Sequence, residues 1–303
     1  MNNISIKKSL TWATKEFEKQ NIDTAQLDAE VLLAYVLNCA RIEIYLRKEE
    51  ELDASSLDFF KSLVARRVRR EPIAYIVGYK EFWKSKIKVT PDVLIPRPET
   101  EGIIELALKL NDQNSWPAKI NFLDLCTGSG CLAAALSTEF PHAQIYVSDI
   151  SEKALALAKE NLAFAGQRVS FLNGNLFEAF NDVRRTKDER LLFDLIVSNP
   201  PYVSETELKG LADDITKYEP IQALVAESEG LAISKKILEE AWNYLKPGAV
   251  LIMEIGIGQA SDLKEYAQAL GRYDSIKIYT DLAGIERYLV VINKMKDTKY
   301  KIQ

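Results

Sequence analysis

Short apolar runs alternate with helical patterns from about residue 119 to the end of the chain. Each run has the length of a strand, and the segments between the runs place apolar residues at helical spacing. Apolar strands that alternate with helices form a parallel sheet that helices cover on both faces. We therefore predict a doubly wound α/β domain. The predicted strands are 120–125, 144–149, 169–173, 193–198, 249–255, 275–280 and 287–292, and the predicted helices lie near 131–139, 151–165, 228–245 and 259–270.

The beginning of the chain, up to about residue 76, has a helical pattern and predicts a separate small domain. Apolar side chains recur there at the spacing of a helix face. The residues that carry this repeat are Ile6, Leu10, Ala13, Phe17, Leu27, Val31, Ala34, Tyr35, Leu57, Phe60, Val64 and Val68.

Residues 77–98 change to alternation, with Ile87 and Val89 placed between lysines, and predict a short β-hairpin that links the two domains. Pro98 then stands where the first turn of a helix accepts proline, and acidic residues follow it. The predicted organisation is a helical domain over 1–76, a hairpin linker over 77–98, an α/β domain over 99–293 and a loose tail over 294–303.

Four arginines, Arg66, Arg67, Arg69 and Arg70, end the last helical segment of the first domain. Cations in the last turns of a helix complement its dipole, which is the simpler interpretation. The alternative is a docking patch for an acidic or phosphate-bearing partner.

The composition is that of an ordinary globular protein, with 47% apolar and 27% charged residues. No apolar stretch reaches the roughly 18 residues of a membrane span, and the N-terminus has no apolar signal core. We expect a cytoplasmic protein without a membrane part. The net charge of −5 argues against broad contact with a nucleic-acid backbone, so no direct nucleic-acid partner is expected.

Cysteine and histidine are scarce, with three cysteines in no CxxC spacing and a single histidine, His142. A disulfide framework and a His/Cys metal site are therefore not expected. His142 follows Pro141 between a predicted helix and a predicted strand, which is typical of a surface loop. Catalysis by a serine or cysteine paired with histidine is disfavoured for the same reason.

The first predicted strand of the α/β domain ends in a glycine-rich turn, "DLCTGSG", residues 124–130. Gly128 and Gly130 allow a tight turn, which exposes backbone N–H groups at the start of the following helix. Asp149 ends the next strand, where a carboxylate can accept hydrogen bonds from ribose hydroxyls. Together these residues predict a nucleoside site. The turn also satisfies the loose dinucleotide pattern of nicotinamide enzymes, but Asp124 ahead of the turn suits a cationic ligand better.

The strand 193–198 ends in Asn199-Pro200-Pro201-Tyr202. Two prolines fix the backbone and cannot donate to a ladder, so the elbow is stiff. The strand should lie beside the first one, where the strand order reverses, and its elbow should open into the same crevice as the glycine turn. Next to a methyl donor, the Asn199 side-chain oxygen and the Pro200 carbonyl could hold a planar NH₂ group and aim its lone pair. Tyr202 could pack on a flat substrate group.

Several motifs make the chain resemble the PrmC/HemK family of class I methyltransferases. The resemblance covers nearly the whole sequence. The motifs that carry it, in order, are "RREPIAYIVG" (69–78), "LIPRPETE" (94–101), "DLCTGSG" (124–130), "IVSNPPY" (196–202), "YEPIQAL" (218–224) and "DLAGIERYL" (281–289). This family methylates the side-chain amide nitrogen (N5) of the glutamine in the GGQ motif of class-1 peptide chain release factors. Its N-terminal helical domain contacts the release factor.

The resemblance implies a Rossmann-like domain with a seven-stranded, mostly parallel sheet, S-adenosylmethionine as cofactor, S-adenosylhomocysteine as product, and no metal. Arg97 and Glu99 are expected in the walls of the cleft. The catalytic residues implied are Asn199 and Pro200, and Pro201 and Tyr202 join them in holding the glutamine. The cofactor-binding residues implied are Cys126, Thr127, Gly128, Ser129, Gly130, Asp149, Asn175, Leu176 and Asn199.

Two residues depart from the family pattern. Cys126 stands where glycine is usual, which costs about 1–2 kcal/mol if the position needs a positive φ. Asn175 replaces a common aspartate and can still accept a hydrogen bond from an adenine amino group.

Three other functions fit part of the pattern. An adenine-N6 methyltransferase would share the NPPY elbow but would need a surface for a flipped base, which an acidic chain does not suggest. A non-catalytic S-adenosylmethionine-binding module would leave the elbow without a use. A nicotinamide dehydrogenase lacks a candidate proton donor near the elbow.

Overall fold

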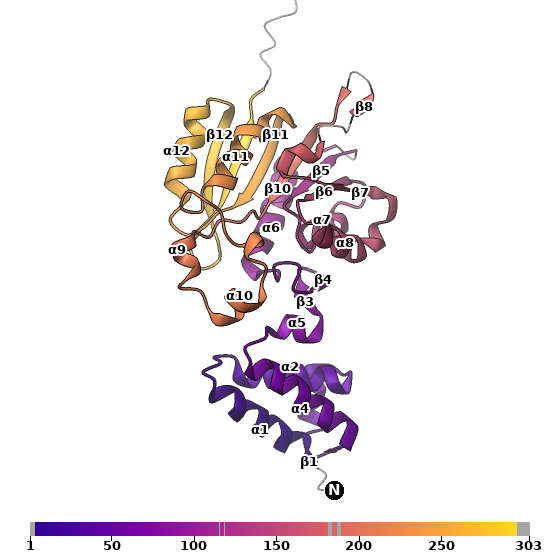
Figure 1. Cartoon of the computed structure of the whole chain (residues 1–303). Helices are drawn as coiled ribbons and strands as arrows, with labels where there is room; N and C mark the ends of the chain where they lie inside the picture. Colours follow the sequence, from indigo (N-terminus) through magenta and orange to yellow (C-terminus); the bar gives the residue numbers. More distant parts are fainter. Residues whose placement is uncertain (1–3, 115, 118, 181–183, 187–188, 296–303) are drawn as a thin grey trace, which may run out of the picture. The chain divides into compact units, whose positions relative to one another are not determined.

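The computed structural model describes residues 4–114, 116–117, 119–180, 184–186 and 189–295, and the chain divides into two compact units (Figure 1). Unit 1 consists of residues 1–79 and 212–218, and unit 2 of residues 80–211 and 219–303. The predicted boundaries place 212–218 with the α/β domain, whereas in the structure this segment packs within unit 1.

Unit 1 is helical, as its sequence pattern predicts. Phe17, Leu33 and Phe60 are fully buried in its core. Ser5 and Asp53 cap two of its helices by accepting hydrogen bonds from backbone N–H groups in the first turn. Its elements are β1 (Ile4–Ser5), α1 (Ile6–Glu18), α2 (Ala25–Leu37), α3 (Arg41–Leu46), β2 (Glu51–Leu52), α4 (Ala54–Val68), α5 (Ile73–Val77) and α10 (Asp213–Tyr218), and β1 pairs with β2.

In the second helix, not every apolar residue at helical spacing is buried. Leu27 and Tyr35 are exposed, whereas Ala29, Leu32 and Leu33 are fully buried. The segment is apolar on most sides, so its periodicity does not select one face. Packing against α1 and α4 decides which side chains of α2 are buried.

The arginines at the end of α4 are engaged inside unit 1. Arg67 is buried and donates hydrogen bonds to Asp28 at 2.7 Å and to Asp214 at 2.9 Å. Arg66 pairs with Glu71, and Arg70 donates to the backbone carbonyl of Gln20. These contacts favour the structural interpretation of the cluster and remove Arg67 from any docking patch.

Unit 2 contains the doubly wound sheet. Its seven strands lie in the order β12-β13-β11-β10-β5-β6-β7, and only the pairs that include β13 are antiparallel. This confirms the predicted seven-stranded, mostly parallel sheet. The strands are β5 (Asn121–Leu125), β6 (Gln144–Asp149), β7 (Val169–Asn173), β10 (Phe193–Ser198), β11 (Leu245–Glu254), β12 (Tyr273–Thr280) and β13 (Glu286–Asn293).

Helices cover both faces of this sheet, and alternate residues of each strand point to opposite faces. Phe122 packs in the core beneath α6, α7 and α8, whereas Leu123 packs in the core beneath α11 and α12 (Figure 1). The helices of unit 2 are η1 (Pro98–Thr100), α6 (Glu101–Asn114), α7 (Cys131–Glu139), α8 (Glu152–Asn161), η2 (Ala163–Arg168), η3 (Leu176–Phe180), α9 (Glu205–Leu208), η4 (Ile221–Ala223), α11 (Ala232–Glu240), η5 (Ala241–Asn243) and α12 (Ala260–Leu270).

Besides the pair β1 and β2, the described residues form two further two-stranded sheets. The predicted hairpin region contains β3 (Tyr79–Phe82) and β4 (Ser85–Lys88), which form one of them. The pair β8 (Arg184–Thr186) and β9 (Glu189–Arg190) was not predicted. Of the predicted tail, residues 296–303 lie outside the described residues.

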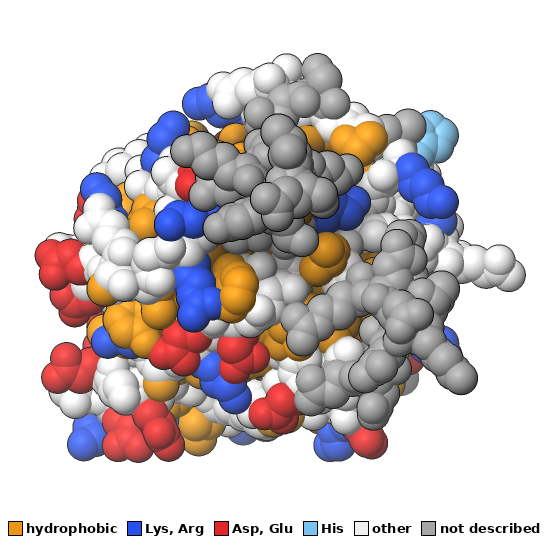
Figure 2. All heavy atoms as spheres, turned by 90° about the horizontal axis from the view of Figure 1, so that it is seen from above, with side chains coloured by type: hydrophobic (Ala, Val, Ile, Leu, Met, Phe, Trp, Pro, Cys, Tyr) orange, Lys and Arg blue, Asp and Glu red, His pale blue; other side chains and the backbone are white. Residues whose placement is uncertain are grey.

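His142 lies where the sequence places it, exposed in the turn between α7 and β6 (Figure 2, pale blue). It is therefore on the surface of unit 2 and does not reach the pocket described below. Among the described residues, no helix has both the length and the apolar character that crossing a membrane requires.

Candidate functional site

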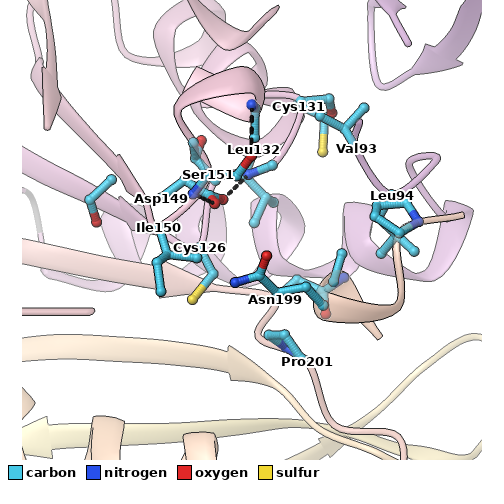
Figure 3. Close-up of a pocket in the computed structure, with 18 of the residues that line it drawn as sticks. Val93, Leu94, Cys126, Cys131, Leu132, Asp149, Ile150, Ser151, Asn199 and Pro201 are labelled. Atoms are coloured by element: carbon cyan, nitrogen blue, oxygen red, sulfur yellow. Dashed lines mark hydrogen bonds between the residues drawn. The ribbon is translucent and has the colours of Figure 1, made fainter. Parts of the chain in front are cut away.

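A pocket in unit 2 opens at the carboxyl ends of the central parallel strands. Cys126 follows β5, Asp149 ends β6, and Asn199 follows β10, which pairs with β5 as predicted. The pocket thus forms where the strand order of the sheet reverses, the usual ligand position in such folds. The close-up shows these three side chains around one space (Figure 3).

Most of the predicted site residues line this pocket. The lining residues among them are Cys126, Thr127, Gly128, Ser129, Asp149, Asn175, Leu176, Asn199 and Pro201, and Arg97 joins them as expected. Gly130, Pro200, Tyr202 and Glu99 are not among the residues that line it.

The glycine turn is built from residues with positive φ. Cys126, Gly128 and Gly130 have φ values of 61°, 52° and 80°. A Cβ added at Gly128 would meet no atom within 4 Å, so its backbone faces open space where a ligand fits. Gly130 begins α7 close to α8, and a Cβ there would approach that of Ala158 to 3.1 Å. Gly130 therefore serves packing behind the pocket.

Cys126 occupies the left-handed region that the family pattern fills with glycine. We therefore expect Cys126→Gly to be more stable than Cys126→Ala by about 1 kcal/mol, because alanine keeps the strain and glycine relieves it. Urea unfolding of the two variants measures the difference. If position 126 were extended, Cys126→Ala would be the more stable variant. That result would contradict backbone strain at Cys126.

Burial raises the pKa of the Cys126 thiol, and the charge of Asp149 raises it further. The thiol therefore stays protonated at neutral pH and is a poor nucleophile. Cys126 contributes a neutral wall to the pocket rather than covalent chemistry.

Asp124 lies behind the turn and is completely buried. Its Oδ2 accepts hydrogen bonds from the Thr127 hydroxyl at 2.6 Å and from the Ala133 N–H at 3.1 Å, while its Oδ1 has no partner in the described structure. The sequence suggested that this carboxylate faces a cationic ligand. In the structure it is absent from the pocket lining and instead holds the turn in shape.

Burial raises the pKa of Asp124 to about 7. An unfolded aspartate titrates near 3.8, so the contribution of Asp124 to folding is lost as pH rises from about 4 to about 7. Each pKa unit corresponds to about 1.4 kcal/mol. We expect Asp124→Asn to remove this dependence: the free energy of unfolding of the wild type, minus that of the variant, should fall between pH 5 and pH 8. If the free energies of unfolding of the wild type and of Asp124→Asn, both measured in urea, changed equally with pH, the expectation would be contradicted.

Asp149 lines the pocket with both carboxylate oxygens held by backbone donors. Its Oδ2 accepts from the Gly128 N–H at 2.9 Å and its Oδ1 from the Ser151 N–H at 2.9 Å. Burial raises its pKa, while these backbone donors lower it. Each carboxylate oxygen can accept a further hydrogen bond, so ribose hydroxyls could be added without displacing the existing ones.

Asn175 and Leu176 follow β7 at the other end of the pocket. Asn175 is exposed, and the buried Leu176 has a positive φ of 51°. Gly174 before them donates its N–H to the carbonyl of Asp149 at 3.1 Å, which joins the two walls. This places an amide side chain and an apolar side chain where the adenine is expected.

The elbow after β10 is held from several sides. The Asn199 side-chain NH₂ donates to the Thr100 hydroxyl at 3.0 Å, and the Tyr202 hydroxyl donates to Glu254 at 3.0 Å. Gln259 donates to the Tyr202 carbonyl at 2.9 Å. Tyr202 is thus directed at a buried carboxylate, and Pro201 rather than Pro200 contributes a side chain to the pocket wall.

The loop before α6 forms a wall of the pocket, of which the sequence analysis identified Arg97, whereas Glu99 does not line the pocket. Val93 and Leu94 also line the pocket (Figure 3). Thr100 at the end of η1 lines it as well. Glu219 anchors this loop by accepting from the Ile95 N–H at 3.1 Å and from Arg97 at 2.6 Å. The backbone carbonyl of Glu99 accepts from the hydroxyl of Tyr288.

These contacts bring together motifs that are far apart in the sequence. Glu219 of the motif 218–224 and Tyr288 of the motif 281–289 both contact the segment 94–101. The sequence offered no signal for these pairings.

The pocket suits S-adenosylmethionine. It combines hydrogen-bond acceptors at Asp149 with open space at Gly128 and with apolar walls. Within the described ranges, histidine, cysteine, aspartate and glutamate form no group of three or more that could hold a metal ion.

Comparisons with known proteins identify the family. A family model described as the PrmC N-terminal domain matches residues 8–78, and one described as the methyltransferase small domain matches residues 106–218. A release factor glutamine methyltransferase from Geobacter sulfurreducens is 40% identical, covering 93% of this chain and 95% of that protein. The chain belongs to the release factor glutamine methyltransferase family.

Other relatives agree with this assignment. Release factor glutamine methyltransferases from Coxiella burnetii and Koribacter versatilis are 39% and 36% identical, and each match covers 98% of the relative and 93% and 95% of this chain. The chain is therefore an enzyme of this family that uses S-adenosylmethionine. The predicted family and cofactor are confirmed.

Solved structures show the same fold at low identity. The N-terminal domain of human METTL16 in complex with SAH has a TM-score of 0.52 and 15% identity, covering 86% of this chain and 93% of that one. The hMettl16 catalytic domain in complex with the MAT2A 3'UTR hairpin 6 has a TM-score of 0.54 and 15% identity, covering 78% and 83%. They support the class I methyltransferase fold.

Proposed function

We propose that this chain methylates the side-chain amide nitrogen of the glutamine in the GGQ motif of class-1 peptide chain release factors. The curated relatives are named release factor glutamine methyltransferases, which supports a glutamine of a release factor as the target. The observation that carries the proposal to this chain is the placement of Asn199: its side chain lines the cofactor pocket while its NH₂ group is bound to Thr100. Its oxygen is therefore left to accept a hydrogen bond from a substrate.

The site residues have separate roles in this proposal. Thr127, Gly128 and Ser129 line the methionine end, Asp149 binds the ribose, and Asn175 and Leu176 flank the adenine. When bound, S-adenosylmethionine supplies an electrophilic methyl group. The arrangement of side chains along the pocket supports this order, from β7 at the adenine end to β10 at the acceptor.

Asn199 and Pro200 act on the acceptor. A glutamine amide nitrogen is a weak nucleophile, because its lone pair is delocalised into the carbonyl. Two acceptors, the Asn199 oxygen and the Pro200 carbonyl, hold its two N–H groups and direct the lone pair, and such orientation can lower the activation barrier by several kcal/mol. Pro201 and Tyr202 keep the elbow in place. As the C–N bond forms, the bond between the methyl group and the sulfonium would break, S-adenosylhomocysteine would leave as the product, and the nitrogen would release its proton to water.

We also propose that the partner is a protein rather than a nucleic acid and that the enzyme acts in the cytoplasm. A protein substrate presented through a short GGQ segment needs no nucleic-acid surface, which agrees with the net charge of −5. Translation termination would place the enzyme in the cytoplasm.

Methyl transfer to competing substrates tests the proposal. The full chain would be given labelled S-adenosylmethionine with unmethylated release factor, with release factor whose GGQ glutamine is replaced by alanine, and with duplex DNA or RNA. We expect label only on the intact GGQ glutamine, located by mass spectrometry of the peptide. Label on adenine instead would support the adenine-N6 alternative, and cofactor binding without transfer would support a binding module.

A further inference from the structure

A chain of hydrogen bonds leads from the acceptor elbow into the protein. The Asn199 side-chain NH₂ donates to the Thr100 hydroxyl at 3.0 Å, and this hydroxyl donates to Glu254 Oε2 at 2.7 Å. The other oxygen of Glu254 accepts from the Tyr202 hydroxyl at 3.0 Å. The three segments are the end of β10, the short helix η1 and the end of β11.

The chemistry of these groups sets the direction of the chain. Burial raises the pKa of the Glu254 carboxyl, and the hydrogen bonds from Thr100 and Tyr202 lower it. Both hydroxyls donate to Glu254, which as a carboxylate only accepts hydrogen bonds, and each hydroxyl has a single hydrogen to donate. Because Thr100 gives this hydrogen to Glu254, its oxygen can only accept from Asn199. Glu254 and Thr100 are 1% and 2% exposed, so bulk water does not compete for these bonds. The NH₂ end of Asn199 must therefore face Thr100.

We propose that Glu254, acting through Thr100, is a positioning residue that keeps the Asn199 oxygen turned toward the acceptor nitrogen. This inference rests on the proposed function, since a glutamine NH₂ needs an acceptor from the enzyme. An asparagine amide has nearly the same shape after a half-turn about its last bond. The flipped amide would present NH₂ to NH₂ and could not hold the substrate.

The same carboxylate also holds the far end of the elbow. Tyr202 and Asn199 are the two ends of the Asn-Pro-Pro-Tyr segment, and both lead to Glu254. A single buried group thus fixes the orientation of the amide and the position of the tyrosine. Hydrogen bonds in such a buried network strengthen one another, and a charged acceptor makes them stronger still.

Thr100→Val with Thr100→Ser as its matched control tests the relay. Valine has nearly the shape of threonine but lacks the hydroxyl, while serine keeps the hydroxyl. We expect Thr100→Val to lower kcat for release factor about tenfold. Thr100→Ser should retain a kcat several-fold above Thr100→Val, and the Kd of both variants for S-adenosylmethionine, measured by calorimetry, should stay near that of the wild type. Equal kcat values for the two variants would overturn the role of Thr100.

Glu254→Gln tests the carboxylate. The glutamine amide can donate to Thr100, which then donates to the Asn199 oxygen and reverses the chain. We expect a kcat below that of the wild type with retained affinity for S-adenosylmethionine. A wild-type kcat in Glu254→Gln would overturn the role of Glu254 in fixing the direction.

The Asn199 side-chain amide can also be observed without any methyl transfer. Its NH₂ signals in the ¹⁵N-labelled full chain are assigned by their loss in Asn199→Asp. We expect these protons to exchange faster with water in Thr100→Val than in the wild type and in Thr100→Ser. Unchanged exchange would overturn the proposal. This readout stands even if wild-type enzyme fails to methylate release factor, a result that would refute the proposed function instead.

Discussion

Replacing Asn199 with alanine should lower kcat for methyl transfer to release factor by at least about a hundredfold. The side chain lines the pocket, and its NH₂ is occupied by Thr100, so its oxygen is the group that meets the substrate. Alanine leaves the acceptor nitrogen with one partner at most and free to turn away from the methyl group. Steady-state kinetics with labelled S-adenosylmethionine measures the loss.

Binding of the cofactor separates this effect from damage to the pocket. The glycine turn and Asp149 do not depend on Asn199 for their hydrogen bonds. Asn199→Ala should therefore bind S-adenosylhomocysteine with a Kd close to that of the wild type. A variant with full cofactor affinity and an unchanged kcat would show that Asn199 does not hold the acceptor.

The strands of unit 2 and the two main motifs were predictable because their information is local. The runs at 144–149, 169–173 and 193–198 coincide with β6, β7 and β10. The strand ends are marked by residues with distinctive backbone behaviour: Gly128 can adopt a positive φ at little cost, and the prolines after Asn199 fix φ. The pairing of β10 with β5 followed from the rules of doubly wound sheets.

The anchors of the pocket wall were not predictable in this way, because each joins residues far apart in the sequence. Thr100 contacts Asn199 and Glu254, and Arg97 contacts Glu219. The sequence does contain one indication that Glu254 has a role in the site, because it is a lone acid at the end of the apolar run 249–255. Asp149 was identified as a site residue for the same reason, namely that an acid at the carboxyl end of a parallel strand lies near the ligand crevice.

Charge patterns were a weaker guide than strand patterns. Arg66, Arg67, Arg69 and Arg70 look alike in the sequence, but their surroundings differ. Arg67 is buried between two carboxylates, whereas Arg66 is partly exposed and pairs with Glu71. Burial is set by the packing of α4 in unit 1, which the order of charges along the helix does not encode.

Replacing Arg67 with methionine should therefore destabilise unit 1 by about 3–5 kcal/mol. The change leaves the buried Asp28 without its cation and frees Asp214 from its contact at 2.9 Å. An unpaired carboxylate in such a place costs more than the pair contributes, because its desolvation is no longer offset. Urea unfolding measures the loss, and hydrogen exchange of residues 212–218 reports it locally.

Two further variants distinguish this cause from a general effect of removing charge. Arg66→Met removes a partly exposed arginine from the same helix and should cost less than about 1 kcal/mol. Adding Asp28→Asn to Arg67→Met removes the stranded charge and should recover part of the stability. Equal losses in Arg66→Met and Arg67→Met would contradict the buried ion pair as the cause.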